Sequence, residues 1–202
     1  MTIAQLIDRH GIISDQVDRH ELRIVLEQLE KALTKGGAVV EFGCYTGTTS
    51  LYLRRLLDLH EDTREFHVYD SFEGLPEKTR EDQSPVGEQF RPGELSVSKK
   101  QFLREFQKAH LRPPIVHKGW FADLAPDDIP DQVAFAFLDG DYYDSIKQPL
   151  KLLGPRLAPG AIIVVDDYGN EALPGAARAV DEWAKARGCT VRMVHTLAIL
   201  TL

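Results

Sequence analysis

Cysteine, long apolar runs and excess basic charge are all scarce in this chain. Its 202 residues include two cysteines, Cys44 and Cys189, in no CxxC pattern. We expect both to be buried thiols in a reducing compartment and not a disulfide. No apolar run approaches the roughly 20 residues that a membrane-spanning helix needs, and the first ten residues lack the basic start and apolar core of a signal peptide. We therefore expect a cytoplasmic protein with no membrane partner.

Basic residues are outnumbered by acidic ones. Lys and Arg total 24 against 31 Asp and Glu, a formal net charge of −7, which argues against nucleic acid as a partner. Hydrophobic residues make up 43% and charged residues 27%, the balance of a soluble globular protein. We expect a single domain over residues 1–202, which would bury roughly 70% of the surface that the unfolded chain exposes.

Several catalytic and binding motifs are also missing. The absence of GxGxxG and of GK[ST] counts against a dinucleotide-dependent oxidoreductase and a P-loop nucleotidase. The absence of a GxSxG elbow counts against a serine hydrolase. The seven histidines form no HxxxH or HExxH pair.

Short apolar runs alternate with amphipathic segments along most of the chain. The runs predict strands, at 38–42, 66–69, 115–117, 133–138 and 161–165. The amphipathic segments predict helices, at 18–34, 46–58, 97–109, 143–154 and 174–187. Continuous apolar strands separated by helices are typical of a parallel sheet covered on both faces.

The two ends of the chain depart from this alternation. Residues 191–194 and 197–200 are strand-like with almost nothing between them, which predicts a hairpin and an antiparallel strand at one sheet edge. The fold class predicted is therefore α/β, a doubly wound, mostly parallel, Rossmann-like sheet with a C-terminal antiparallel hairpin. Residues 1–36 are expected to form N-terminal helices, which could cap the sheet or make a homodimer interface.

Residues 74–96 fit neither strand nor helix. They contain three prolines, three glycines and many charges, and they directly follow a predicted strand end. A long irregular segment at that place is either a disordered insertion or a functional lid. We favour the lid, because α/β proteins bind their ligands at the carboxyl ends of their strands.

Two predicted strand ends carry residues suited to an adenosine ligand. Gly43 and Gly47 follow the first strand, where glycines and free helix amides allow close approach of a carboxylate or phosphate. Asp70 ends the second strand, and an acidic residue there can accept both ribose hydroxyls. Either feature could instead be a structural turn. Trp120 and Phe121, after the third strand, suit packing on an adenine or covering of the sheet edge.

Acidic residues follow the fourth and fifth strands. Asp139 and Asp166 are 27 residues apart, enough for one helical crossover, so we expect them at the same end of neighbouring strands about 4.8 Å apart. With Asp141 and Asp167 they crowd one rim, and no basic residue adjoins either run. Carboxylates this close repel unless a cation compensates them, which favours a hard divalent ion. The alternative is that Asp141, Asp144 and Asp167 cap helices or shape turns.

Five segments together resemble a known enzyme family. They are Val39–Ser50 (VVEFGCYTGTTS), Tyr69–Pro76 (YDSFEGLP), Gly119–Phe121 (GWF), Leu138–Ser145 (LDGDYYDS) and Val165–Tyr168 (VDDY). The first resembles motif I of class I S-adenosylmethionine methyltransferases, and the combination resembles the macrocin O-methyltransferase family over about residues 37–187. Catechol O-methyltransferase is similar more distantly. The resemblance implies a metal-dependent enzyme that methylates sugar hydroxyls of natural products.

The resemblance also implies a role for each matching residue. S-adenosylmethionine would be bound at its methionine part by Gly43, Tyr45 and Thr49, with Glu41 supporting the loop and Thr46 and Gly47 also in the cofactor site. Asp70 would bind its ribose, and Ser71, Gly119, Trp120 and Phe121 would surround its adenine. The metal ligands, for Mg²⁺ or Mn²⁺, would be Asp139, Asp166 and Asp167. Asp141 would be the general base.

A chemical mechanism accompanies this resemblance. A divalent ion that binds two vicinal oxygens would acidify and orient a sugar hydroxyl, and Asp141 would take its proton as the methyl group leaves the sulfonium. We expect the acceptor to be a small-molecule diol on a glycoside. Two alternatives remain open at this point: a phenolic acceptor of the catechol type, and a non-catalytic module that binds an adenosine nucleoside.

Overall fold

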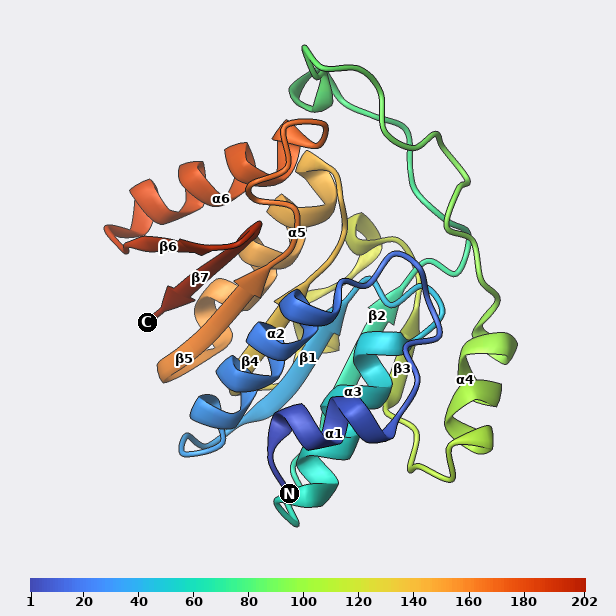
Figure 1. Cartoon of the computed structure of the whole chain (residues 1–202). Helices are drawn as coiled ribbons and strands as arrows, with labels where there is room; N and C mark the ends of the chain where they lie inside the picture. Colours follow the sequence, from blue (N-terminus) through green and yellow to red (C-terminus); the bar gives the residue numbers. More distant parts are fainter.

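A seven-stranded sheet forms the centre of the protein in the computed structural model, which describes all 202 residues (Figure 1). The strands lie in the order β3-β2-β1-β4-β5-β7-β6. Their bounds are β1 Ala38–Phe42, β2 Phe66–Asp70, β3 Ile115–Lys118, β4 Val133–Leu138, β5 Leu157–Val165, β6 Val191–Val194 and β7 Leu197–Thr201. Strands β1 to β5 pair in parallel, while β7 is antiparallel to both β5 and β6. The predicted doubly wound sheet with a C-terminal hairpin is confirmed.

Six helices cover the two faces of this sheet. They are α1 Ile3–Arg9, α2 Arg19–Ala32, α3 Thr48–Leu59, α4 Lys99–Lys108, α5 Tyr143–Leu153 and α6 Pro174–Arg187. Side chains of α1 to α4 share one apolar cluster, and those of α5 and α6 share the other. None of the helices is both long and apolar enough to cross a membrane.

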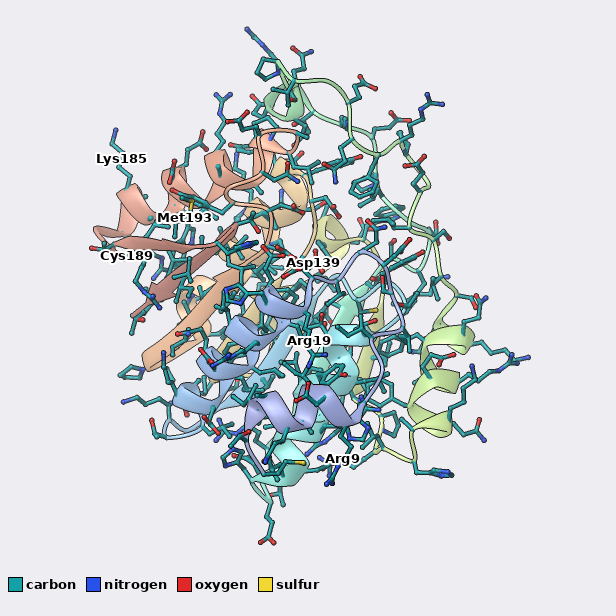
Figure 2. The ribbon with its side chains drawn as sticks, in the orientation of Figure 1. Arg9, Arg19, Asp139, Lys185, Cys189 and Met193 are labelled. Atoms are coloured by element: carbon teal, nitrogen blue, oxygen red, sulfur yellow. The ribbon has the colours of Figure 1, made fainter.

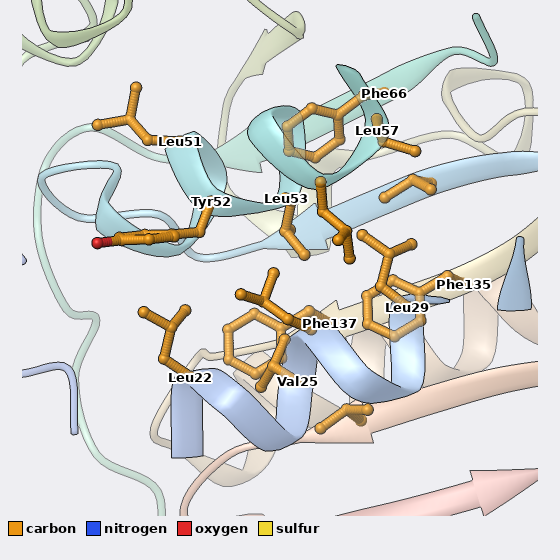
Figure 3. Packing of buried hydrophobic residues seen from close by; sticks show 14 of the residues in the cluster. Leu22, Val25, Leu29, Leu51, Tyr52, Leu53, Leu57, Phe66, Phe135 and Phe137 are labelled. Atoms are coloured by element: carbon orange, nitrogen blue, oxygen red, sulfur yellow. The ribbon is translucent and has the colours of Figure 1, made fainter. Parts of the chain in front are cut away.

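Strand β4 shows how the two clusters form. Its six residues are all buried. From Phe135 to Leu138, after a register irregularity, the side chains alternate between the faces because successive residues of a strand point in opposite directions. Phe135 and Phe137 pack beneath Val25 and Leu29 of α2 (Figure 3), whereas Ala136 and Leu138 belong to the cluster of α5 and α6. A continuous apolar run therefore marks a central strand with both faces covered.

Several element boundaries differ from the predicted ones by one or two residues, and the start of β5 differs by four. Strand β5 begins at Leu157 and not at residue 161, because Leu157 pairs with Val133 ahead of a register irregularity. Helix α3 begins at Thr48, since Gly47 before it has a left-handed backbone with φ of 88°. Neither change moves the carboxyl ends of the strands.

Residues 74–96 run outside the sheet and return to the start of α4 (Figure 1). Apart from one 3₁₀ turn at Arg80–Asp82, the segment has no regular structure. Its ends are held together, because Leu75 N donates to Glu94 O at 2.9 Å and Gly93 N donates to Leu75 O at 2.8 Å. The segment is thus a closed loop that rises beside the carboxyl ends of the strands.

Candidate active site

A cavity of about 420 Å³ opens at the carboxyl ends of β1, β2, β4 and β5. Segments far apart in the chain line it: the residues before and at the start of α2, the turn after β1, residues 74–96, and the first turns of α5. Nine carboxyl side chains line it and no Lys, Arg or His does: Glu21, Glu41, Asp70, Glu77, Asp139, Asp141, Asp144, Asp166 and Asp167. In Figure 2 Asp139 lies near the centre of the view, whereas the side chain of Lys185 extends at the periphery. The cavity is therefore strongly anionic.

The turn after β1 depends on glycine for close packing. Gly43 has φ of 84°, and a Cβ there would lie 1.9 Å from the carbonyl oxygen of Asp139. Gly47 has φ of 88°, and a Cβ there would lie 2.9 Å from the ring of Phe102. Side chains at either position would thus collide with a neighbouring element. Gly43 lines the cavity, whereas Gly47 does not.

The Asp70 carboxylate joins this turn to the end of β2. Its Oδ2 accepts from Cys44 N at 2.8 Å, and its Oδ1 accepts from Phe72 N at 2.7 Å. Because these hydrogen bonds from backbone amides fix both oxygens, the carboxylate is held in one orientation at the cavity. Ser71 beside it lines the cavity too, and its hydroxyl donates to Gly74 O at 3.1 Å.

Aromatic residues after β3 form a further wall. Trp120 and Phe121 line the cavity, and the Phe121 ring packs edge-on against Phe42 with the centroids 5.4 Å apart. Gly119 lies outside the lining, and its amide donates to Asp70 O at 3.0 Å. The third strand end is thus tied to the second through the backbone.

The Glu41 side chain is fully buried, yet it borders the cavity. Ser50 Oγ donates to its Oε2, while its Oε1 has no hydrogen-bond partner. Burial raises the pKa of Glu41 to about 8, and the bond from Ser50 opposes this rise. A buried acceptor atom without a partner, placed at a cavity wall, suits a donor group of a ligand.

The two acidic runs meet as predicted at one rim. Leu138 lies beside Val165 in the register of β4 and β5, which sets Asp139 next to Asp166. The ladder continues through these residues, since Asp139 N donates to Phe42 O and Asp166 N to Leu138 O, each at 2.8 Å. Asp141 and Asp167 follow with left-handed backbones, φ 62° and 56°.

The carboxylates of this rim repel one another. Burial, followed by the charges of Asp141 and Asp167, raises the pKa of Asp139 well above its usual range. Burial and the charge of Asp139 do the same for Asp166. The pKa of Asp167 is raised by burial, and Asn170 Nδ2, which donates to its Oδ1 at 2.9 Å, counteracts that rise. No positive side chain of the cavity compensates these groups.

The oxygen donors of the rim are of the kind that a hard divalent cation prefers. In this arrangement, no three His, Cys, Asp or Glu side chains converge as a ready-made metal site. Asp139, Asp166 and Asp167 therefore fit such an ion by their chemistry and their uncompensated charge, and their side chains would have to turn toward it.

The structure adds cavity residues that sequence reasoning missed. Ser14, Gln16, Val17 and Glu21 form a wall from the N-terminal part of the chain. Residues 74–96, which the sequence places next to the ligand site, contribute a second wall. Glu21 Oε1 lies 2.8 Å from His195 Nδ1, which ties the start of α2 to the β6–β7 turn. Irregular segments such as 10–18 lack the periodicity that would place them, so no sequence signal marked this wall.

The seven-stranded fold is that of Rossmann-like O-methyltransferases. The solved O-methyltransferase NovP superposes with a TM-score of 0.79 at 26% identity, covering 90% of this chain and 78% of that one. A calicheamicin methyltransferase superposes with a TM-score of 0.77 over 98% of this chain and 90% of the other, and at 20% identity this likeness concerns the fold alone.

Sequence comparison identifies the family. The model of the macrocin-O-methyltransferase (TylF) family matches residues 14–198, and the chain belongs to that family. Its relatives include an 8-demethyl-8-(2,3-dimethoxy-alpha-L-rhamnosyl)-tetracenomycin-C 4'-O-methyltransferase of Streptomyces olivaceus, 37% identical over 71% of this chain and 58% of the relative. Mycinamicin III 3''-O-methyltransferase of Micromonospora griseorubida is 30% identical over 83% of this chain and 68% of the relative. The chain spans about three fifths of the first of these relatives.

Proposed function

We propose that this protein transfers the methyl group of S-adenosylmethionine to a sugar hydroxyl of a glycosylated natural product. The observation that carries the proposal is that the turn after β1, Asp70 and a rim of carboxylates line one and the same cavity. Family membership and the sugar acceptors named for two relatives support it. The acceptor of this chain is a glycoside with a vicinal diol.

The cofactor occupies the half of the cavity built by β1, β2 and the residues after β3. Its methionine part lies against the turn after β1, with Glu41 Oε1 available to its ammonium group. Asp70 accepts from the ribose hydroxyls, and Trp120 and Phe121 pack on the adenine. Carboxylates suit this ligand, because both its sulfonium and its ammonium group are cationic.

The metal half of the proposal rests on Asp139, Asp166 and Asp167, which would hold Mg²⁺ or Mn²⁺. The bound ion would supply Lewis acidity that lowers the pKa of an acceptor hydroxyl. Asp141 takes the proton of that hydroxyl as general base, and its left-handed backbone turns it to the cavity side of the rim. The walls of the cavity align oxygen, methyl carbon and sulfur for in-line transfer.

Calorimetric titration of S-adenosylmethionine tests the cofactor assignment. We expect Asp70→Ala to weaken binding about tenfold to a hundredfold, the effect of losing hydrogen bonds to a charged group. Asp123→Ala is the matched control, because Asp123 is exposed and outside the cavity. Wild-type protein that binds no S-adenosylmethionine at any metal concentration would refute the proposal.

Methyl transfer from labelled S-adenosylmethionine tests the acceptor and the metal. We expect transfer to natural-product glycosides with a vicinal diol, abolished by EDTA and restored by Mg²⁺. Catechol serves in the same assay as the phenolic alternative. Faster transfer to catechol than to every glycoside would overturn the sugar assignment, and full activity in EDTA would overturn the metal.

A further inference from the structure

Asp82 is a buried carboxyl group in a loop that is mostly exposed or half-buried. It lies within residues 74–96 and is 3% exposed, although nearby Arg80 and Gln83 are exposed. It is not part of the cavity lining. A buried carboxylate requires hydrogen-bond partners, so its contacts reveal what the loop is fastened to.

The partners of Asp82 are backbone groups of two elements. Its Oδ1 accepts from Tyr143 N, the first residue of α5, at 2.6 Å. Its Oδ2 accepts from Thr79 N at 2.8 Å and from Thr79 Oγ1 at 2.7 Å. Helix α5 has no side-chain cap of its own at Tyr142. Asp82 therefore caps a helix that begins 61 residues further along the chain.

Helix α6 leaves room for this carboxylate. A Cβ on Gly175 would lie 1.9 Å from Asp82 Oδ1 and 2.7 Å from Tyr143 N. Glycine is unfavourable inside a helix relative to alanine, and this one does not have the left-handed backbone that would call for glycine. Its lack of a side chain is what lets Asp82 reach the start of α5.

The bond to Tyr143 N lies two residues after Asp141, which we assign as the general base. Asp141 has a left-handed backbone, and Tyr142 N donates to Gly140 O at 2.7 Å to close the tight turn between them. A non-glycine residue keeps such a conformation only when its surroundings hold it. The Asp82 bond holds the outgoing end of that turn.

The same loop also reaches the second acidic run. Asn170 Nδ2 donates to Asp167 Oδ1 at 2.9 Å and to Gln89 Oε1 of the loop at 3.3 Å. Nearby, Ser84 Oγ donates to Glu171 O at 2.7 Å. Each acidic run is thus in contact with one fastening point of residues 74–96.

We propose that Asp82 is a positioning residue: it seats residues 74–96 on the start of α5 and thereby holds Asp141 in place for proton abstraction. The proposal rests on the proposed function, since it concerns the base of that reaction. Asp141 is then in position to accept the proton only when residues 74–96 are bound to the start of α5. A protein whose loop is unseated binds the cofactor and turns over poorly.

Two substitutions disrupt the contact between Asp82 and the start of α5, one at Asp82 and the other at Gly175. Asp82→Ala deletes the carboxylate, and Gly175→Ala displaces it with a methyl group while leaving Asp82 unchanged. Asp82→Asn keeps an oxygen for Tyr143 N and loses one acceptor for Thr79, so it should restore part of the activity. Glu81→Ala is the matched control, a neighbouring carboxylate with no hydrogen-bond or ion-pair partner in the structure.

The measurements are kcat and KM for the glycoside, the S-adenosylmethionine Kd, and the rate of limited proteolysis within residues 74–96. For Asp82→Ala and Gly175→Ala we expect kcat to fall about tenfold or more, as for a lost bond to a charged acceptor. Cleavage should become several-fold faster, and the cofactor Kd should stay within about twofold of wild type. Glu81→Ala should resemble wild type throughout.

Unchanged kcat in both variants would overturn the proposal, and so would an equal loss of cofactor binding and turnover, which indicates general loss of structure. If residues 74–96 of both variants were cleaved no faster than those of the wild-type protein, the inference that Asp82 fastens this loop to α5 would be wrong. Wild-type protein that transfers no methyl group would refute the proposed function instead. The proteolysis contrast between Asp82→Ala and Glu81→Ala would then decide whether Asp82 seats the loop.

Discussion

Glu41 shows how a single residue can link the cavity to the stability of the fold. Its side chain has no exposure, and burial raises its pKa to about 8, so it is mostly neutral at pH 7 in the folded protein. In the unfolded chain its pKa returns to an ordinary value near 4.5. A group whose pKa is raised by folding contributes stability below its unfolded pKa and loses it as the pH rises through the folded one.

From this residue we predict a pH-dependent stability between pH 4.5 and 8. In that range the Glu41 contribution should decrease by roughly 1.4 kcal/mol for each pH unit. Glu41→Gln should remove this component of the slope, because glutamine does not titrate. Urea unfolding at pH 5, 6.5 and 8 measures it, with exposed Glu171→Gln as control. A slope equal to that of wild type in Glu41→Gln would show that Glu41 is ionised in the folded protein.

At the scale of elements, the meeting of β1 and β4 requires a glycine. The Asp139 carbonyl occupies the place where a Cβ of residue 43 would lie, 1.9 Å away. We predict that Gly43→Ala destabilises the protein by about 2–4 kcal/mol, since it adds a clash to an unfavourable left-handed backbone. Gly11→Ala is the control, because nothing lies within 4 Å of its Cβ position. Denaturant unfolding of both variants tests this, and equal midpoints would refute it.

The elements differ in how far the sequence could foretell them. The apolar run Val133–Leu138 indicates a buried parallel strand, and the short connection after residue 194 indicates an antiparallel pair. The meeting of Asp139 with Asp166 and the C-terminal hairpin were therefore predictable. The cap that Asp82 provides for α5 was not. It joins an irregular loop to a helix distant in the chain, and neither periodicity nor turn chemistry encodes such a contact.

At the scale of the whole molecule, negative charge gathers where the strands end. Nine carboxyl groups line one cavity whose lining contains no Lys, Arg or His, in a chain whose net charge is only −7. Like charges held together in a partly buried space oppose folding, and a bound cation or the removal of one charge relieves them. The apo protein is therefore less stable than its hydrophobic clusters alone would make it, and the deficit is located at the rim.

This charge arrangement predicts that a bound Mg²⁺ ion and the removal of one rim charge each stabilise the protein, and that removing the charge abolishes most of the Mg²⁺ effect. At neutral pH we expect Mg²⁺ to raise the Tm of wild-type protein, because an ion that binds the folded state alone stabilises it. Asp166→Asn should raise the Tm of the apo protein by a few degrees, about 1 kcal/mol of relieved repulsion, and should lose most of the response to Mg²⁺. Asp123→Asn, at an exposed residue outside the cavity lining, should keep the wild-type Tm and the wild-type response. Calorimetric melting of the three proteins in EDTA and in Mg²⁺ separates the contributions.

A lower Tm for apo Asp166→Asn would mean that the carboxylate is held by favourable contacts in the apo state, and the rim would then be a structural network with no need for an ion.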